Sequence, residues 1–516
     1  MRLSLSALLL STALATGFGA GALTLLAPAV QAQDAAVQAG EVDVDALLAL
    51  LPPKVKASYG SKSYDSLTGI TTVRDLKIFD PANEAQNFIA VREIGLRGVD
   101  MAAFKYVFDF AAYGPTPDET FKQLFGDILI KNASVTLEGK SVAALEEIAL
   151  GGVQMKQLAA KPPGEAGTPN DEKAGGQFLG ALLDSSITGE IKLTNLTMEG
   201  DGNKASIKSL VFGGINRGQF GPSTIDTFES TAAGLVTKIA SATSEGADLT
   251  KVIPWLLKGE MPPVGPDALL YFGRASVNGL SYDMAGTTVS IASYTVEPIN
   301  FYWLVPSSLK IALNDIYYKP SAADGSGAQE GLAELGVDHL NLNIGLDWQF
   351  DGTTGGASLK ELRIAESQLF DTVLSFDLTG INLAQLVDPA TAQGAMMGVG
   401  LTGAQLFVKN NGGFEKLLAI AAREENSTPD AVRQMALQQL SQFDAGVPQP
   451  DGTVKPLTDR LKSIVAAFKA FISSPGTLTI KVQPPTPITM GTGMGALFDP
   501  MSGADALGIT VEATPQ

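Results

Sequence analysis

The chain contains no cysteine and only one histidine in its 516 residues. The absence of cysteine excludes disulfide scaffolds, thiolate zinc sites, iron–sulfur clusters and cysteine nucleophiles. With one histidine, a histidine-rich metal site is excluded, and serine–histidine–aspartate chemistry would depend on His339 alone. We therefore expect a protein that is not an enzyme, with no catalytic residue, no cofactor and no metal site.

Charged and aromatic side chains are also scarce, at 17% and 7% of the chain. The formal net charge is −18, and this acidic excess argues against nucleic acid or an anionic lipid surface as a partner. Hydrophobic residues reach 45%, which suffices for a folded core and excludes disorder. The 55 glycines and 28 prolines predict many turns. At about 150 residues per domain, the length fits three domains or one repetitive assembly.

The N-terminus has the pattern of a secretion signal. A short basic start precedes an apolar run from Leu3 to Leu26, and small residues follow at Val30 and Ala32. Small residues at this spacing suit signal peptidase, so we predict a signal peptide over 1–32 and export to a bacterial periplasm. The run is also long enough to remain as an uncleaved membrane anchor. No later stretch approaches 18 apolar residues, so no transmembrane helix is expected after signal removal.

Alternation of apolar and polar residues predicts β-strands over much of the chain. The longest example is Leu340–Phe350, and Glu190–Thr194 is a shorter one. Such alternation is typical of a strand with one dry and one wet face. Dipeptides that favour hairpin turns end the predicted strands: Glu138-Gly139, Asp201-Gly202, Ala285-Gly286, Asp351-Gly352 and Asn411-Gly412.

Two segments look like copies of one unit. Residues 126–132 match 189–195, and residues 148–154 match 210–216 after a turn. Residues 69–101, 273–301 and 340–364 resemble the same unit more weakly. Repetition of this kind predicts a continuous sheet in which each unit covers its neighbour's edge.

A smaller pattern places Asn, Asp or Gly between apolar residues and shifts the apolar alternation by one. The central residue tolerates positive φ, which predicts a β-bulge that reverses the two faces. About nine matches are expected by chance, so the pattern carries less weight than the copied unit. Examples are Val73–Ile78, Ile130–Val135, Leu193–Met198, Leu313–Tyr318 and Leu378–Leu383.

Helical periodicity is confined to a few segments. They are 43–51, 223–240, 247–257, 414–424, 429–443 and 457–472. Thr428 is the expected N-cap of the fifth, with Pro429 at its first position. An apolar stripe on the last predicts a helix that lies on the sheet. The alternative is a helix that lies on a membrane or covers a lipid-filled groove.

These observations predict the following organisation along the chain. The parts are a signal peptide (1–32), a first β-repeat region with an N-terminal helix (33–160), a linker (161–176), a second β-repeat region (177–319) with a helical insertion (223–257), a linker (320–330), a third β region (331–412), a helical segment (413–472) and C-terminal strands with a Gly/Pro-rich tail (473–516).

The motifs that resemble known chemistry are better explained by structure. Gly139-Lys140-Ser141 lacks the earlier glycine of a phosphate-binding loop and is read as a hairpin turn. The glycines of 491–495 do not have dinucleotide-binding spacing. Ser307 and Lys310 have serine–lysine spacing, but in a strand they face opposite sides. His339 beside Asp338 is read as an edge histidine. The tryptophans are expected to serve packing: Trp255, Trp303 and Trp348.

The export segment and the repeated hairpins at 126–154 and 189–216 resemble the AsmA-like group of bacterial envelope proteins. The resemblance covers about residues 65–410 and rests on pattern alone. It implies a long curled sheet with an apolar inner face, and an association with moving or organising lipids. Family members usually keep an uncleaved N-terminal anchor, and the 414–472 helices have no obvious counterpart there. No functional residue carries over.

The sequence therefore predicts a mainly β (α+β) fold: a curled, repetitive antiparallel sheet with helical insertions and a C-terminal helical segment. The predicted function is that of an exported envelope protein that binds or moves lipid along an apolar sheet face. The alternative is a structural or interaction protein with a closed β core and no ligand. The expected partners are lipid or another envelope protein.

Overall fold

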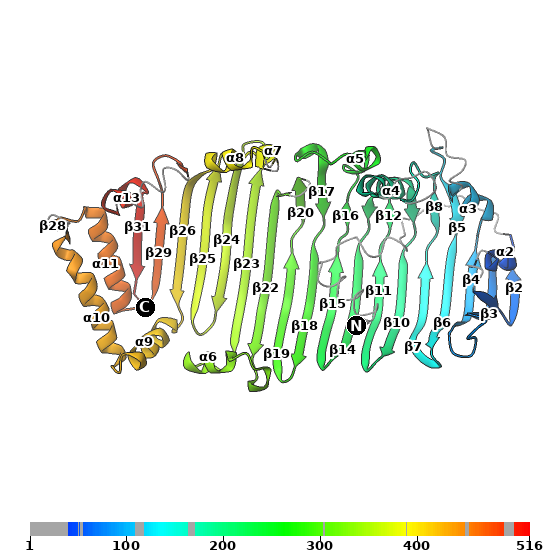
Figure 1. The fold of residues 1–516 in the computed structure, drawn as a ribbon, viewed down its shortest axis with the longest axis horizontal. Coiled ribbons are helices and arrows are strands. Elements are labelled where there is room, and N and C mark those ends of the chain that lie inside the picture. The colour runs from blue at the N-terminus through cyan, green and yellow to red at the C-terminus, as the bar shows by residue number, and fades with distance from the viewer. Residues whose placement is uncertain are drawn as a thin grey trace. The chain divides into compact units, whose positions relative to one another are not determined.

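The computed structural model describes a mainly β chain (Figure 1). The described residues are 40–49, 51, 55–108, 118–163, 171–302, 305–386, 388, 390–448, 454–489 and 500–515. Within them, 20 strands belong to a large antiparallel sheet and nine short strands to a second sheet. The predicted signal peptide, 1–32, lies outside the described residues.

The chain forms two compact units, and each is described by itself. Unit 1 comprises Met1–Ser230 and Thr243–Pro262, and unit 2 comprises Thr231–Ala242 and Pro263–Gln516.

In unit 1, long strands of the large sheet pair in sequence order. The ladder runs from β3 through β4, β6, β7 and β10 to β11, and β1 and β2 both pair with β3. The bounds are β1 (Lys56–Ser58), β2 (Ser61–Asp65), β3 (Ile70–Phe79), β4 (Phe88–Arg97), β6 (Asp127–Leu137), β7 (Lys140–Leu150), β10 (Ile191–Gly200) and β11 (Asn203–Phe212).

Short strands of unit 1 form a second ladder in the order β5, β8, β9, β12, β13, β16. The bounds are β5 (Lys122–Phe125), β8 (Val153–Met155), β9 (Ser186–Thr188), β12 (Ile215–Asn216), β13 (Gln219–Phe220) and β16 (Ala247–Asp248). Helices of the unit are α2 (Val44–Leu48), α3 (Met101–Phe108), α4 (Glu172–Ser185) and α5 (Ile253–Lys258).

Glycines mark the points where the chain passes from the large sheet to the small one. Gly151 follows β7, and a Cβ there would lie 2.5 Å from the Cα of Gly189, which precedes β10. Only glycine permits this approach of two backbones. The same Gly-Gly step lies at 213–214, between β11 and β12, in the second copy of the unit.

In unit 2, the large-sheet ladder runs β18, β19, β22, β23, β24, β25, β26, β29, β31, and β30 also pairs with β26. A small ladder joins β17, β20 and β21. The bounds are β17 (Leu269–Phe272), β18 (Ala275–Met284), β19 (Thr287–Val296), β20 (Ile299–Tyr302), β21 (Val305–Pro306), β22 (Ser308–Lys319), β23 (Leu340–Asp351), β24 (Gly356–Glu366), β25 (Phe370–Thr379), β26 (Gly400–Asn410), β29 (Thr477–Val482), β30 (Ile488–Thr489) and β31 (Ile509–Thr514).

The helices of unit 2 lie between and after these strands. They are α6 (Ala328–Glu334), α7 (Leu383–Leu386), α8 (Ala392–Gly398), α9 (Gly413–Glu424), α10 (Pro429–Ser441), α11 (Asp459–Ser473) and α13 (Pro500–Ala506), and β27 (Val447–Pro448) pairs with β28 (Val454–Lys455) after α10. Three of them, α9 to α11, confirm the helices predicted over 414–424, 429–443 and 457–472. The Thr428 side chain accepts a hydrogen bond from the Ala431 backbone N–H, as predicted for the N-cap.

The helical insertion predicted over 223–257 is wrong. Residues 223–244 form two strands, β14 (Ser223–Ala232) and β15 (Leu235–Ser244). Between them Ala233 and Gly234 both have positive φ, 51° and 83°, as a tight hairpin turn requires. Alanines in this stretch favour a helix by propensity, but strand context overrides propensity. Only α5 is helical within the predicted insertion.

Both predicted linkers differ from the structure at their C-terminal ends. The first, 161–176, overlaps α4, which begins at Glu172 with Asp171 as its N-cap. The second, 320–330, overlaps α6, which begins at Ala328. Glycines within these helix starts resemble linker composition, and helix packing offsets their low propensity.

The copied hairpins are confirmed. Residues 126–154 form β6, β7 and β8, and residues 189–216 form β10, β11 and β12 in the same order. Their turns have matching backbone angles: φ is 52° and 74° at Glu138 and Gly139, and 52° and 79° at Asp201 and Gly202. Positive φ at both positions matches the right-handed twist of the flanking strands.

Left-handed residues inside the strands confirm part of the predicted bulge pattern. Asn132 and Asn195 both have φ 49°, Asp75 has 56° and Asp315 has 51°. The expected one-strand bulge is wrong at Asn195, because the residue opposite, Lys208, also leaves the ladder and the register does not change. The register does shift beside Asp315, between β22 and β23.

The left-handed residue reverses the apolar alternation in both paired strands. In β10 the apolar side chains are Ile191 and Leu193 before Asn195, and Leu196 and Met198 after it. A regular strand would place the second pair on the opposite face. Their ladder partners in β11 shift in the same way, so apolar side chains stay opposite apolar side chains.

Candidate functional site

The large sheet of unit 2 separates apolar from polar side chains. In the β18–β19 ladder Val277 lies opposite Tyr294, whereas Asn278 lies opposite Ser293. The same separation continues through later ladders and produces apolar rows that run across the strands. One row is unbroken over nine strands: Ala275, Val296, Ile311, Leu346, Leu362, Leu374, Leu406, Ile480 and Val511. We call the surface that carries it the unit 2 apolar face.

Helix α11 covers one end of this face. Phe471 of α11 is buried with Leu478 of β29 and Val511 of β31, and Ile464 and Phe468 pack against the same cluster. Phe414 of α9 contacts Phe471 edge to face, with ring centroids 5.5 Å apart. This confirms the prediction that the apolar stripe of 457–472 lies on the sheet.

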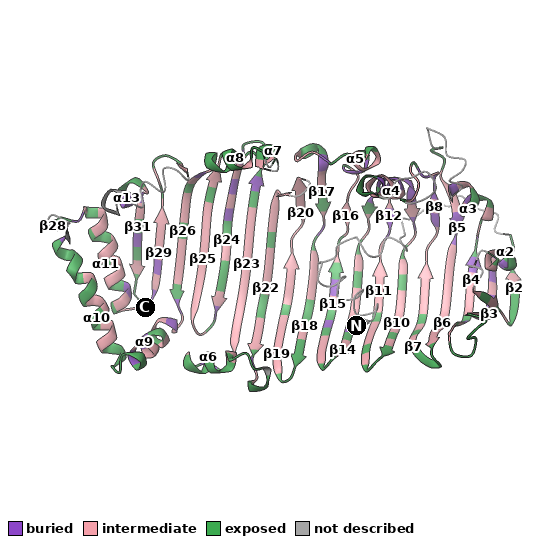
Figure 2. Cartoon of the chain, in the orientation of Figure 1, coloured by how far each residue is buried: buried purple, intermediate pink, exposed green. Residues whose placement is uncertain are grey.

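Beyond α11 most of the apolar face is half-buried, whereas Phe350, Ala357 and Leu359 near one end of β23 and β24 are buried. Every member of the nine-strand row is of intermediate exposure except Val511, which lies under the helix cluster. In the adjoining rows Ile364 is 49% exposed and Tyr282 is 37% exposed. Figure 2 shows intermediate exposure along most of β19, β22 and β25, and half of the residues of β18 are exposed. Within the described residues, this part of the face lacks the helical cover that α11 gives to β29 and β31.

Unit 1 repeats the arrangement at smaller scale. Val42 and Val44, the latter in α2, are buried against Val73 and Val91 of β3 and β4. The row that begins at Val73 continues into strands where it is half-buried: Ile94, Ile130, Ile148, Leu193 and Leu210. We call this surface the unit 1 apolar face. Within the described residues, none of β6, β7, β10 or β11 contains a buried side chain.

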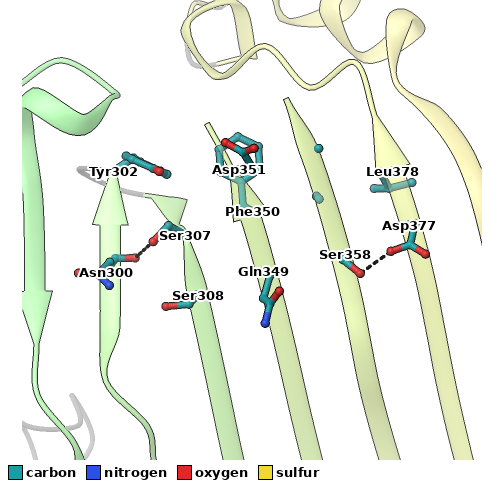
Figure 3. A pocket seen from close by; sticks show the side chains of 12 residues that line it. Asn300, Tyr302, Ser307, Ser308, Gln349, Phe350, Asp351, Ser358, Asp377 and Leu378 are labelled. Carbon is teal, nitrogen blue, oxygen red and sulfur yellow. Dashed lines mark hydrogen bonds between the residues drawn. The ribbon is translucent and has the colours of Figure 1, made fainter. Parts of the chain in front are cut away.

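A hollow of about 630 Å³ lies in unit 2 beside the end of β20 (Figure 3). Neighbouring strands contribute Ser308, Gln349, Ser358 and Asp377, which follow one another across the ladder. The Ser358 hydroxyl donates to the Asp377 carboxylate. Other lining residues are Asn300, Tyr302, Ser307, Phe350, Asp351, Gly356, Ala357 and Leu378. Because these residues come from five separate segments, no spacing in the sequence identified them.

His339 is held on both ring nitrogens. Its Nδ1 lies 2.6 Å from the Asp338 carboxylate and its Nε2 lies 3.1 Å from the Asn341 amide nitrogen. An amide nitrogen can only donate, so Nε2 accepts and Nδ1 carries the proton that is donated to Asp338. The hydrogen bond from His339 holds the pKa of the Asp338 carboxyl below its ordinary value. The Tyr317 ring lies 5.1 Å from the imidazole. With both nitrogens occupied, His339 is positioned as a packed edge residue.

The other motif residues lie in ordinary structural roles. Gly139 lies in the β6–β7 turn, as predicted, and Lys140 is the first residue of β7. The Ser307 hydroxyl donates to the Asn300 carbonyl at 3.0 Å, while Lys310 lies opposite Asp347 in the β22–β23 ladder. Residues 491–495 and Trp303 lie outside the described residues.

The two described tryptophans differ in setting. The Trp348 indole N–H donates to the Pro306 carbonyl at 3.3 Å, so its ring is fixed beside the start of β22. Trp255 lies on α5 under the Lys258 ammonium, which is 5.0 Å from the ring centroid.

No motif in the sequence indicated that Lys156 would be buried. The Lys156 side chain is 2% exposed, and its Nζ lies 2.5 Å from Asp184 and 2.6 Å from Glu119. Arg217 also contacts Asp184, at 2.7 Å. Burial alone would raise the pKa of the Asp184 carboxyl, but the hydrogen bonds from Lys156 and Arg217 outweigh it and hold the pKa below its ordinary value. This cluster ties α4 to the small sheet of unit 1.

Among the described residues, no group of three or more His, Cys, Asp or Glu side chains is placed to hold a metal ion. None of the described helices is long and apolar enough to cross a membrane.

Comparisons with known proteins add one partial match. A family described as "Uncharacterized protein" matches residues 363–514, from β24 to β31 and under half of the chain. No curated protein matches the chain. The matched segment contains α11 and the strands that it covers, together with part of the half-buried apolar face.

Proposed function

We propose that the chain is an exported, non-enzymatic protein of the bacterial envelope that binds the acyl chains of lipid along its apolar sheet faces. The observation that carries this proposal is the unit 2 apolar row, which continues over strands that α11 does not cover. A contiguous apolar surface that stays partly accessible to water is typical of a binding surface on a protein. An acyl chain laid on the face would remove apolar side chains from water, as α11 does at β29 and β31.

The finer architecture belongs to the same proposal. We infer that the sheet curls toward its apolar faces, and the left-handed residues support this because such irregularities increase strand twist. The AsmA-like resemblance favours the same lipid-binding reading.

Native purification followed by lipid mass spectrometry tests the proposal. The full chain is expected to carry lipid, or to take up a labelled lipid from vesicles. A protein that purifies without lipid and takes up none would instead support the structural role with no ligand.

A charge placed on the apolar face is expected to reduce lipid uptake. Ile364 is 49% exposed, so Ile364→Glu leaves the core intact but introduces a carboxylate where an acyl chain would lie. We expect at least a tenfold loss of labelled-lipid uptake, which corresponds to about 1.4 kcal/mol.

Gln405→Glu is the matched control. Gln405 is an exposed residue of β26 on the opposite face, between Ser375 and Lys481 in the ladders, so this variant adds the same charge away from the proposed site. Equal losses in the two variants would contradict binding at the apolar face. Circular dichroism of both proteins checks that the sheet is retained.

A further inference from the structure

The hollow beside β20 presents polar side chains that are not used by the protein itself. Among the described residues, the amide groups of Asn300 and Gln349 and the hydroxyls of Ser308 and Tyr302 have no hydrogen-bond partner, and all four line the hollow (Figure 3). Amides and hydroxyls both donate and accept hydrogen bonds. Four such groups around one space match a ligand that is rich in hydroxyl groups.

The two carboxylates of the hollow already have partners within the protein. The Asp351 carboxylate accepts from the backbone N–H of Thr353 at 2.8 Å and from the Thr354 hydroxyl at 2.8 Å, so it caps the turn after β23. Asp377 accepts from Ser358 and lies 3.8 Å from the Lys360 ammonium. These contacts fix both carboxylates, and their negative charge disfavours an anionic ligand.

An aromatic ring is fixed at the edge of the hollow. Tyr302 and Phe350 meet edge to face, with centroids 6.0 Å apart and an interplanar angle of 84°. The Tyr302 ring also lies against Gly352, where an added Cβ would be 3.3 Å from the ring carbons. The ring therefore keeps one orientation, and its apolar surface with a polar tip suits a ligand that has both C–H and O–H groups.

We propose that this hollow binds a neutral sugar unit. Its volume of about 630 Å³ lies within the range of small-molecule sites in proteins. Sugar hydroxyls pair with Asn300, Ser308 and Gln349, while the ring of Tyr302 contacts the sugar C–H groups. Ser308, Gln349 and Asp377 lie on the face opposite to the apolar row, so a substitution at Gln349 leaves the proposed lipid surface unchanged and the two proposals can fail separately.

Calorimetric titration of the full chain with neutral monosaccharides, disaccharides and a neutral glycan chain tests the proposal. We expect saturable binding of at least one of these, unaffected by salt because the ligand carries no charge. Equal affinity for the monosaccharide and the chain identifies a free sugar, and tighter binding of the chain identifies a polysaccharide segment. The absence of binding across the panel overturns the proposal, as does binding of calcium ion at the hollow in place of any sugar.

Substitutions in the hollow test whether the sugar binds there. Gln349 is exposed, so Gln349→Ala removes its amide without loss of packing, and we expect about tenfold weaker sugar binding. Tyr302→Phe keeps the ring and removes only the hydroxyl, with a smaller expected loss. Gln405→Ala makes the same truncation on β26 outside the hollow and is expected to leave the affinity unchanged. Equal weakening by Gln349→Ala and Gln405→Ala overturns the assignment of the sugar to this hollow.

Discussion

Lys156 shows how a single residue can hold a charge in the interior of unit 1. A buried ammonium is costly unless it is paired, and here two carboxylates approach it within hydrogen-bond distance. Asp184 is the inner partner, because its side chain is 19% exposed against 69% for Glu119. The interaction of Lys156 with Asp184 should therefore contribute more to stability than ion pairs at the surface.

Removal of the inner carboxylate is expected to destabilise unit 1. Asp184→Asn leaves the Lys156 charge buried with only its outer partner, and we expect the free energy of unfolding to fall by about 3 kcal/mol. Glu199→Gln breaks the exposed Lys204–Glu199 pair and is expected to cost under about 0.5 kcal/mol. Urea unfolding of both variants gives the comparison, and equal costs would contradict the special role of the buried pair.

The same pair predicts a dependence on pH. Because the pKa of Asp184 is lowered in the folded state, its contribution is fully present above the ordinary carboxyl pKa of about 4. This contribution of Asp184 to stability is lost as pH falls through the lowered pKa of Asp184 in the folded protein.

Tyr106 provides a residue-scale prediction at high pH. Its hydroxyl donates to the Asp118 carboxylate, and this hydrogen bond raises the pKa of Tyr106 to about 12. The hydrogen bond contributes fully to the stability of the folded protein below the ordinary tyrosine pKa of about 10. This contribution is lost as pH rises through the raised pKa of Tyr106 in the folded protein. Asp118→Asn is expected to move this ionisation toward the ordinary value. Phenolate absorbance measured between these two pH values should then increase by one tyrosine, and an unchanged titration would contradict the contact.

At the scale of elements, the left-handed residues set which face of each strand is apolar. In β10 the Asn195 amide also donates to Glu146 of β7, which helps to hold the residue in place. Asparagine tolerates the left-handed region better than most residues, whereas β-branched residues are strained there.

Substitution at Asn195 separates backbone strain from side-chain contacts. Asn195→Val is expected to lower the free energy of unfolding by about 1–2 kcal/mol, and Asn195→Gly by about 0.5 kcal/mol, through the lost bond to Glu146. Thr194→Val places the same side chain at the preceding position, which is not left-handed, and is expected to be nearly neutral. Thermal unfolding ranks the three variants. An equal cost for valine and glycine at 195 would show that the backbone conformation is not limiting.

The sequence predicted elements best where local chemistry and tertiary context agree. Alternation in β23 and the N-cap of α10 act locally, so both were predictable. The strands at 223–244 were not, because their alanines resemble a helix and only pairing decides. The apolar faces could be expected from alternation, but their half-buried state depends on where α2 and α11 end. The hollow beside β20 brings together residues from 300 to 378 and left no local pattern.

The whole molecule carries a net negative charge of −18 although only 17% of its residues are charged. With 54 acidic against 36 basic side chains, like charges repel one another in the folded chain at neutral pH. Because exposed charges are screened by salt, this repulsion weakens as ionic strength rises.

Stability at neutral pH is therefore expected to increase with moderate salt. The unfolding midpoint at pH 7 should rise by a few degrees between about 10 mM and 150 mM sodium chloride. Near pH 4.6, the isoelectric point of the sequence, the same salt increase is expected to have little effect. An equal effect of salt on the unfolding midpoint at both pH values would exclude net charge repulsion as the cause of the salt dependence.

The position of the left-handed residues has a consequence for the length of the sheet. Asn132, Asn195 and Gly279 each lie six residues before the first turn residue of their hairpin. Each hairpin thus contains its own turn, its own reversal of faces and its own apolar pairs, so inserting or deleting a whole hairpin preserves the register of its neighbours. Since two strands span about 10 Å, the width of an apolar face changes in steps of that size. Under the proposed function, the area of apolar face that is open to lipid therefore changes by whole hairpins.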